Sequence, residues 1–268
     1  MIATCPVHGT RLELASPPRR VVSFVSSATE TLFALGCGDD VAGVTPYCAR
    51  YVPGLAAPVV GDYLNADLDA LASLEPDLVL VTQGVQQAFG RRLAEAGLPV
   101  YALPLPRSRW GILENQLTLG GLMHRVAEVR ALNTRLEAGF EALMAAAPVP
   151  RPRVVVELWF GAHQRTIQGL TFIHDLLELA GMEPLFGSES GAYPRLDLAR
   201  VEAARPDVWL LFQESDFPVD GDALAAARGW RLPRIDAGVA CGRNPIHDGP
   251  SFLDTAFWLR ERLQEVIR

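Results

Sequence analysis

Short apolar runs alternate along this chain with longer segments in which apolar residues recur at spacings of three and four. The short runs predict buried strands, and the longer segments predict helices. The predicted strands occupy residues 21–25, 41–44, 78–81, 100–103, 154–158, 208–212 and 234–236. The predicted helices occupy residues 27–36, 67–73, 86–96, 109–119, 124–147, 171–180, 198–204 and 251–267. Because strands and helices alternate, the pattern predicts an α/β fold with mostly parallel sheets flanked by helices.

Local signals predict where several of these helices begin and end. Ser27 and Glu30 have the spacing of a capping box, which predicts that Ser27 opens the first helix. Gly97 closes the helix over residues 86–96, because glycine readily adopts the left-handed conformation that ends a helix. The proline-rich residues 148–152 stop the long helix that precedes them.

Residues 61–81 recur in altered form at residues 191–211, without a gap. The matching positions include Gly61 with Gly191, Tyr63 with Tyr193, Asp67 with Asp197, Leu68 with Leu198, Pro76 with Pro206 and Asp77 with Asp207. Each copy has the pattern of an aromatic turn, a short helix, a break at Pro-Asp and a buried strand. The repeat therefore predicts two related lobes, and a crevice between such lobes is a common place for a small ligand to bind.

The predicted elements divide the chain into three segments. An α/β lobe spans residues 20–105, connecting helices span residues 106–150, and a second α/β lobe spans residues 151–268. The helix over residues 124–147 is the most regular amphipathic segment and is expected to join the two similar lobes. A single long helix is a stiffer connection than crossing strands, so we expect little hinge closure.

Composition and charge exclude two classes of protein. The chain has 268 residues, of which 49% are hydrophobic and 21% charged, and no apolar run approaches the ~20 residues that a membrane-spanning helix needs. The net charge of −7 and the lack of a basic patch argue against a nucleic-acid partner. Residues 1–20 show no apolar core of an export signal, which predicts a cytoplasmic protein if the printed start is the real one.

The cysteines and histidines form no recognisable metal motif. Cys5, Cys37, Cys48 and Cys241 are too widely spaced for a metal knuckle and too few for a disulfide scaffold, so we expect mostly free thiols. The histidines are His8, His124, His163, His174 and His247, and none shows the short spacing of a zinc site. Signatures of nucleotide-binding loops and nucleophile elbows are absent as well, so the sequence predicts a protein that is not an enzyme.

A family resemblance covers the chain from Arg20 onward. Its segments are RVVSFVSSATETLFALG, VAGVTPYC, LDALASLEPDLVL, AGLPVYAL and PRLDLARVEAARPDVWLL, together with the long helix. These segments resemble the substrate-binding proteins of ABC importers for vitamin B12, ferric siderophores and haem, and are most similar to those for vitamin B12. The resemblance implies a monomeric, extracytoplasmic protein that holds a cobalamin-type corrinoid in the interlobe cleft and leaves it chemically unchanged. No cofactor is expected, because the ligand brings its own metal.

The resemblance also implies which residues line the cleft. The expected ligand-binding residues are Tyr47, Cys48, Tyr63, Trp159, Phe160, Tyr193 and Arg243. Aromatic rings with polar tips suit a flat macrocycle that has an apolar face and an amide-bearing rim. The alternation of a strand lets only one of Trp159 and Phe160 point toward the ligand, and Cys48 is equally explained as a small packing residue. His163, Gln164 and Arg165 follow that strand and are expected near the rim.

A permease partner in the membrane is implied by the same resemblance. An acidic residue near the start of each repeated helix would dock to it, and the matching positions are Asp69 and Ala199. Asp67 and Asp197 are the symmetric acidic pair, but the helix N-cap is the simpler role for both. Asp69 and Asp197 are therefore the docking candidates.

Other ligands and roles remain open. Ferric siderophores and haem suit an aromatic cleft too, although Arg165, Arg195 and Arg243 are the only plausible cleft arginines, which favours a neutral ligand. A cytoplasmic corrinoid-handling protein would use the same cleft without a permease. Direct binding of zinc or manganese is the least favoured alternative.

Overall fold

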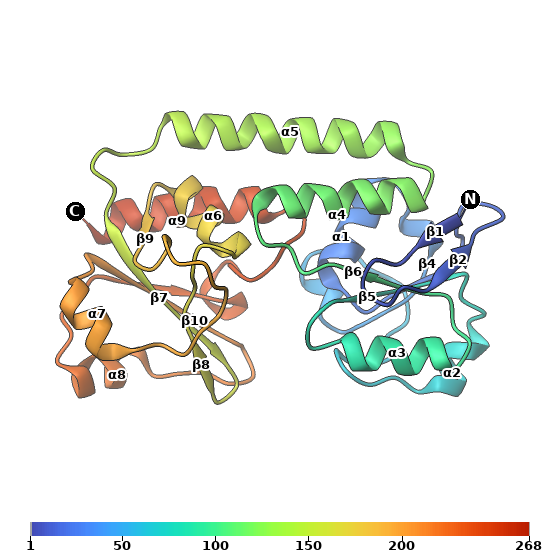
Figure 1. Ribbon diagram of the computed structural model, residues 1–268, viewed down its shortest axis with the longest axis horizontal. Coiled ribbons are helices and arrows are strands. Elements are labelled where there is room, and N and C mark those ends of the chain that lie inside the picture. Colours follow the sequence, from blue (N-terminus) through green and yellow to red (C-terminus); the bar gives the residue numbers. More distant parts are fainter. Residues whose placement is uncertain (1, 268) are drawn as a thin grey trace. The chain divides into compact units, whose positions relative to one another are not determined.

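A computed structural model describes residues 2–267, and its chain divides into two compact units (Figure 1). Unit 1 comprises Met1–Pro106, Trp110–Arg135 and Asp248–Pro250, and unit 2 comprises Arg107–Arg109, Leu136–His247 and Ser251–Arg268. Each unit contains its own sheet with helices against it, which confirms the predicted α/β fold class. Across the described residues, no helix combines the length and the apolar character that crossing a membrane requires.

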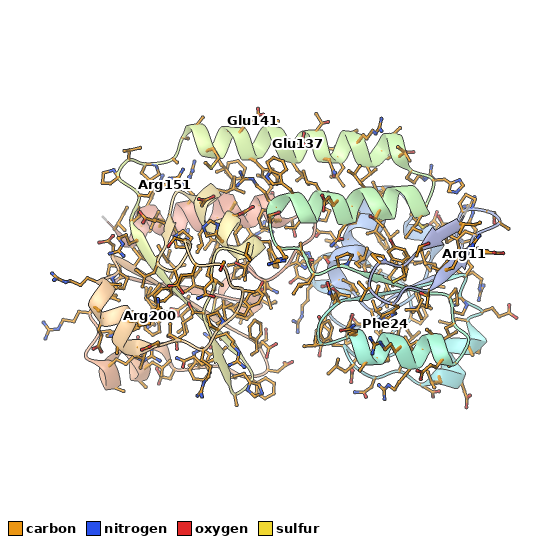
Figure 2. All side chains as sticks on the ribbon, viewed as in Figure 1. Arg11, Phe24, Glu137, Glu141, Arg151 and Arg200 are labelled. Atoms are coloured by element: carbon orange, nitrogen blue, oxygen red, sulfur yellow. The ribbon has the colours of Figure 1, made fainter. Side chains whose placement is uncertain are left out.

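Unit 1 is built on a four-stranded parallel sheet with the strand order β4-β3-β5-β6. The strands are β3 (Val21–Ser23), β4 (Val41–Val44), β5 (Leu78–Thr82) and β6 (Val100–Leu103), and the helices are α1 (Ser26–Ala34), α2 (Leu68–Ser73), α3 (Gln87–Glu95) and α4 (Arg109–Leu122). A hairpin of β1 (Ile2–Thr4) and β2 (Arg11–Glu13) precedes them. Every residue of β5 and β6 is buried, because α3 and α4 lie on opposite faces of the sheet (Figure 1). Phe24 packs edge-on against Phe89 of α3 inside this core (Figure 2).

Unit 2 is built on a five-stranded sheet with the order β11-β10-β7-β8, in which β9 also pairs with β7. The strands are β7 (Arg153–Phe160), β8 (His163–Arg165), β9 (Glu183–Pro184), β10 (Val208–Gln213) and β11 (Arg234–Ala237). The helices are α6 (Phe172–Ala180), α7 (Leu198–Ala204), α8 (Gly221–Arg228) and α9 (Phe252–Val266). All pairings are parallel except that of β8 with β7. β8 is thus the second arm of a hairpin and has no parallel neighbour.

The long helix α5 (Val126–Ala145) contributes to both units, since the division falls between Arg135 and Leu136. Its second half packs against α9 within unit 2. Phe140 meets Phe252 edge to face at 6.0 Å between ring centroids, and Arg260 of α9 donates a hydrogen bond of 2.6 Å to the carbonyl of Leu143. These contacts make the second half of α5 part of the core of unit 2.

The sequence repeat has the same local structure in both units. Asp67 and Asp197 are the N-caps of α2 and α7, and each carboxylate accepts two backbone N–H groups of the first turn, which confirms the predicted capping role. After the two helices, Glu75 and Arg205 adopt left-handed backbone angles, with φ of 45° and 47°. The chain therefore leaves both helices through the same strained turn.

A second shared feature ties each repeat to the first strand of its sheet. The side chain of Asp77 accepts the backbone N–H of Arg20 at 3.0 Å, and that of Asp207 accepts the backbone N–H of Arg153 at 2.7 Å. Each arginine donates from its guanidinium to a carbonyl at the end of the repeat helix. We call this arrangement the Asp–Arg clasp. It explains why the Pro-Asp pair recurs in the sequence.

The predicted capping box at the first helix is wrong. α1 begins at Ser26 with Val25 as its N-cap, and no side chain makes a cap hydrogen bond there. Ser27 lies inside the first turn and is buried. The chain passes from β3 to α1 through a turn in which the hydroxyl of Ser23 bonds the carbonyl of Val25, and this turn starts the helix earlier than a capping box at Ser27 would.

Candidate functional site

The β7–β8 hairpin of unit 2 carries a candidate site. β7 ends at Phe160, the chain turns at Gly161 with φ of 56°, and β8 pairs back so that Trp159 lies opposite Gln164. The carboxylate of Glu214 accepts the backbone N–H of Gly161 at 2.8 Å and holds the turn. The pairing of β8 with β7 and the hydrogen bond at the turn therefore hold the side chains of this hairpin in one arrangement.

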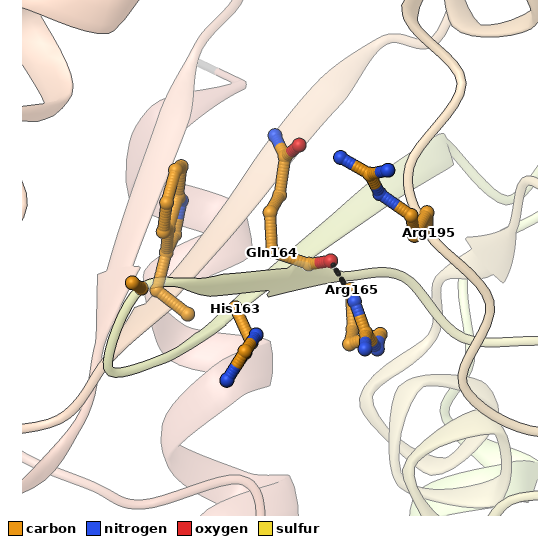
Figure 3. A pocket seen from close by; sticks show the side chains of 6 residues that line it. His163, Gln164, Arg165 and Arg195 are labelled. Atoms are coloured by element: carbon orange, nitrogen blue, oxygen red, sulfur yellow. Dashed lines mark hydrogen bonds between the residues drawn. The ribbon is translucent and has the colours of Figure 1, made fainter.

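A pocket of about 350 Å³ lies along this hairpin. It is lined by Trp159, Ala162, His163, Gln164, Arg165 and Arg195 (Figure 3). The side chains of Gln164 and Arg195 extend on one side of β8, and those of His163 and Arg165 extend on the other (Figure 3). The pocket thus combines one indole wall with a polar, cationic rim, which suits a flat ligand whose edge carries polar groups.

A buried carboxylate beneath the pocket orients two of its walls. Glu157 has no exposed surface, and its Oε1 accepts hydrogen bonds from Nε1 of Trp159 at 2.9 Å and from Nε2 of Gln164 at 2.7 Å. Arg228 completes the arrangement with two parallel hydrogen bonds of 2.7 and 2.9 Å to the same carboxylate. Because its charge is paired and its oxygens have several donors, this carboxylate is satisfied in the core.

Arg228 is itself held by the aromatic core of unit 2. Its guanidinium lies over the rings of Trp209 and Trp230, at 5.6 and 4.8 Å from the ring centroids. The two indoles meet edge to face at 5.2 Å. A chain of contacts therefore runs from the core through Arg228 and Glu157 to the pocket walls.

The predicted ligand-binding residues of unit 2 are placed as follows. Trp159 is half-buried and lines the pocket, whereas Phe160 packs on Phe212 with ring centroids 5.9 Å apart. Tyr193 is half-buried in the loop before α7, outside the pocket lining. Arg243 is half-exposed, and its guanidinium lies 3.8 Å from the carboxylate of Asp254.

The predicted residues of unit 1 are not among those that line the pocket on the β7–β8 hairpin. Tyr63 is 38% exposed, and Tyr47 is half-buried beneath the guanidinium of Arg50, 4.9 Å from the ring centroid. Cys48 is completely buried, and its sulfur lies 3.2 Å from the hydroxyl of Thr29. This burial fits the alternative in which Cys48 fills a gap in the core as a small apolar side chain.

The docking candidates are both on repeat helices. Asp69 is exposed on the first turn of α2, whereas the carboxylate of Asp197 is engaged as the N-cap of α7.

All four cysteines are free, as the sequence predicted.

Sequence reasoning missed Glu157 and Arg228, whereas it named Arg165 and Arg195 among the plausible cleft arginines, and both line the pocket. One signal was available for Glu157, because a charged residue interrupts the apolar run VVVELWF. A buried charge in a strand indicates a specific partner. Nothing in the sequence identifies Arg228 as that partner, since 71 residues separate the two.

One group of potential metal ligands occurs among residues 2–267. His174, Asp175 and Glu178 on α6 have ligand atoms within 4.8 Å of one another. Asp175 already accepts the backbone N–H of Arg109 at 2.8 Å, and the guanidinium of Arg109 lies 4.0 Å away. The hydrogen bond to Asp175 raises the pKa of His174, although burial opposes the shift. Arg109 therefore already engages one of the two carboxylates of this group, that of Asp175.

Known proteins resemble the chain in sequence and in fold. A family model described as periplasmic binding protein matches residues 21–232. A cobalamin-binding protein of Halobacterium salinarum is 30% identical over 241 residues, which cover 87% of this chain and 64% of that protein. The chain therefore spans less than two thirds of that relative's length.

A second curated relative and a solved structure also resemble the chain. A vitamin B12-binding protein of Photorhabdus laumondii is 23% identical over 199 residues, covering 73% of this chain and 71% of that protein. The crystal structure of a periplasmic heme-binding protein of Vibrio cholerae superimposes with a TM-score of 0.75 at 20% identity, covering 91% of this chain and 98% of that chain. This structural similarity establishes the shared fold.

Proposed function

Because the chain belongs to the periplasmic binding protein family, we propose that it is the substrate-binding protein of an ABC-type importer. Its ligand is a cobalamin-type corrinoid, which it binds without chemical change and without a cofactor of its own. The observation that carries this proposal is the pocket on the β7–β8 hairpin, with an indole wall and a polar rim. A corrin ring has a broad apolar face for the indole and amide groups around its edge for the rim.

The comparisons support the ligand class and the setting of this proposal. The Halobacterium and Photorhabdus relatives are both named for binding cobalamin or vitamin B12. The family as a whole consists of binding proteins, which supports a role outside the cytoplasm and a membrane permease as partner. Asp69, exposed on the first turn of α2, is the docking residue that we retain for that permease.

Haem or a ferric siderophore is the second candidate ligand. The cationic rim formed by Arg165 and Arg195 favours it, because these chelates carry anionic groups. The fold shared with the Vibrio heme-binding protein accommodates such a ligand as well.

Calorimetric titration with cyanocobalamin, haem and a ferric siderophore tests the proposal. We expect wild-type protein to bind cyanocobalamin with micromolar or tighter affinity, and Trp159→Ala to weaken it at least tenfold, because truncating an aromatic anchor typically costs about 2 kcal/mol or more. The matched control is Phe257→Ala, an exposed aromatic residue on α9 of the same unit. Tyr63→Ala and Tyr193→Ala, titrated in parallel, test the two tyrosines that the repeat pairs.

Three results would change the proposal. Binding of haem or the siderophore without cobalamin would transfer the function to iron or haem uptake. No binding of any of the three ligands would overturn the proposed function. Equal losses in Trp159→Ala and Phe257→Ala would remove Trp159 from the site.

A further inference from the structure

A small polar cavity lies in unit 1, at the carboxyl ends of β3, β5 and β6. Its volume is about 10 Å³, which is the room that one water molecule needs. We infer that this cavity is the binding site of one ordered water molecule, which caps the N-terminus of α1 and links it to the buried side chain of Gln116 on α4. The inference concerns unit 1 alone and goes beyond the proposed function, because it does not involve the ligand of the importer.

The topology of the sheet explains why a cavity forms at this place. From β3 the chain passes through α1 to β4 on one side, whereas β5 pairs with β3 on the other side. Where the connections of two neighbouring strands diverge in this way, a crevice is left outside their carboxyl ends. Val25, which follows β3, and Thr82, the last residue of β5, both line the cavity.

The side chain of Gln116 provides the first argument. Gln116 is 2% exposed and lines the cavity from α4. Among the described residues, neither its Oε1 nor its Nε2 has a hydrogen-bond partner. A buried amide without partners is costly, because burial removes the hydrogen bonds that it makes with water in the unfolded chain. A water molecule in the cavity restores those hydrogen bonds.

The N-terminus of α1 provides the second argument. The N-cap is Val25, and no side chain makes a cap hydrogen bond to this helix. The first backbone hydrogen bond of the helix runs from the N–H of Thr29 to the carbonyl of Val25, so the N–H groups of residues 26–28 need other acceptors. Ser27 and Ala28 line the cavity. The oxygen of a water molecule there takes the place of the missing side-chain cap.

The chemistry of the lining favours water over an ion. Asp248 lines the cavity, and none of the described residues around it is Lys or Arg, so an anion would meet a carboxylate without a compensating charge. A cation would meet the positive end of the α1 macrodipole. Thr31, also in the lining, donates its hydroxyl proton to the carbonyl of Ser27 at 2.8 Å and keeps its lone pairs as acceptors. Because water both donates and accepts, it suits this mixed lining.

High-resolution crystal structures of the wild-type protein, one of them from a crystal soaked in rubidium bromide, test the site directly. We expect a single density peak in the cavity, about 2.7–3.2 Å from the side-chain amide of Gln116 and from a first-turn N–H group of α1. We expect no anomalous signal from rubidium or bromide at that peak. An anomalous signal there would identify an ion instead of water and overturn the inference, as would a cavity without a density peak.

The variant Gln116→Leu tests the site by the sign of a change in stability. If a water molecule bridges Gln116 and α1, the variant removes one of its partners, and we expect the Tm to fall by about 3 °C. If the amide is simply unsatisfied, leucine removes a buried polar group and the Tm rises. Gln264→Leu makes the same change at an exposed position on α9, and this control should shift the Tm by less than about 1 °C. A raised or unchanged Tm in Gln116→Leu contradicts the inference.

A rescue variant separates loss of the water from poor packing of the new leucine. Val25→Thr exchanges a methyl group for a hydroxyl at the N-cap of α1, where a threonine oxygen accepts N–H groups of the first turn. We expect it to recover at least half of the Tm lost in Gln116→Leu. In the wild-type background we expect a smaller gain, because the water already supplies the acceptor. An equal effect of Val25→Thr in both backgrounds would show that Gln116 and the cap of α1 share no water.

Discussion

Glu157 has no exposed surface and holds three side chains through one carboxylate. Burying a charge is costly unless a partner and hydrogen bonds compensate for it, and Arg228 provides the partner. The same carboxylate orients Trp159 and Gln164 at the pocket. At the scale of single residues, one side chain therefore links the core of unit 2 to the walls of the pocket.

Removing one partner of this pair is expected to be costly. Glu157→Gln leaves the guanidinium of Arg228 largely buried without a carboxylate, and we expect the free energy of unfolding to fall by about 3–5 kcal/mol. Urea denaturation followed by circular dichroism measures the change. The double variant Glu157→Gln/Arg228→Met removes both charges, and it should recover at least half of the loss. A double variant no more stable than the single one would show that the ion pair is not the cause.

The residues of the pocket were only partly predictable from sequence. Trp159, Gln164 and Arg165 follow a recognisable apolar strand, so their position at its end can be anticipated. Arg195 reaches the same pocket from another loop, and that proximity depends on the tertiary fold. The complete burial of Cys48 could not be predicted from sequence, because it depends on how η2 (Cys48–Arg50) packs against α1.

At the scale of elements, the predicted strands and helices agree with the structure wherever an apolar pattern marks them. The repeat helices α2 and α7 and the buried strands β5 and β10 lie within one residue of their predicted ranges. The segments that escaped prediction were β1, β2, β8, β9 and α8. β8 has the sequence HQR and no apolar residue, so only its pairing with β7 makes it a strand. Helix α8 is rich in alanine, and its buried positions are few.

The end of α7 gives a prediction for backbone strain. Arg205 holds a left-handed conformation at the C-cap, which disfavours residues with a Cβ atom. We expect Arg205→Gly to raise the free energy of unfolding by about 0.5–1 kcal/mol, because glycine relieves this strain. The matched control is Gly229→Ala at the C-cap of α8, where φ is 66° and the space around the Cβ position is open.

The control should move in the opposite direction, with a loss of about 1 kcal/mol, because only the backbone conformation opposes the added methyl group. Thermal unfolding of both variants measures the two shifts. A stabilised Gly229→Ala, or a destabilised Arg205→Gly, would contradict the assignment of strain to these caps.

At the scale of the whole molecule, neither unit is a continuous stretch of chain. Unit 2 takes Arg107–Arg109 and the second half of α5 from the part of the sequence that precedes its sheet. Leu136, Phe140 and Leu143 of that half are buried. Gly139 lies so close to Leu253 of α9 that an added Cβ atom would force the Leu253 side chain to move. Each unit is therefore built from segments that are not contiguous in the sequence.

A pair of fragments tests this organisation. Fragment 151–268 lacks α5, whereas fragment 136–268 keeps its second half. Burial of three apolar side chains contributes about 6 kcal/mol, which is a large part of the stability of a typical domain. We expect the shorter fragment to show little helical circular dichroism and no cooperative thermal transition, and the longer fragment to unfold cooperatively. Equal stability of the two fragments would show that α5 is dispensable for unit 2.

The β7–β8 hairpin has no counterpart in unit 1, where β3 leads directly into α1. The Asp–Arg clasp, by contrast, occurs in both units. The clasp is therefore shared by both copies of the repeat, whereas the hairpin belongs to one unit alone. Because residues 159–165 form one contiguous segment at the edge of a sheet, the pocket walls on this hairpin can be redesigned while the cores of both units stay intact.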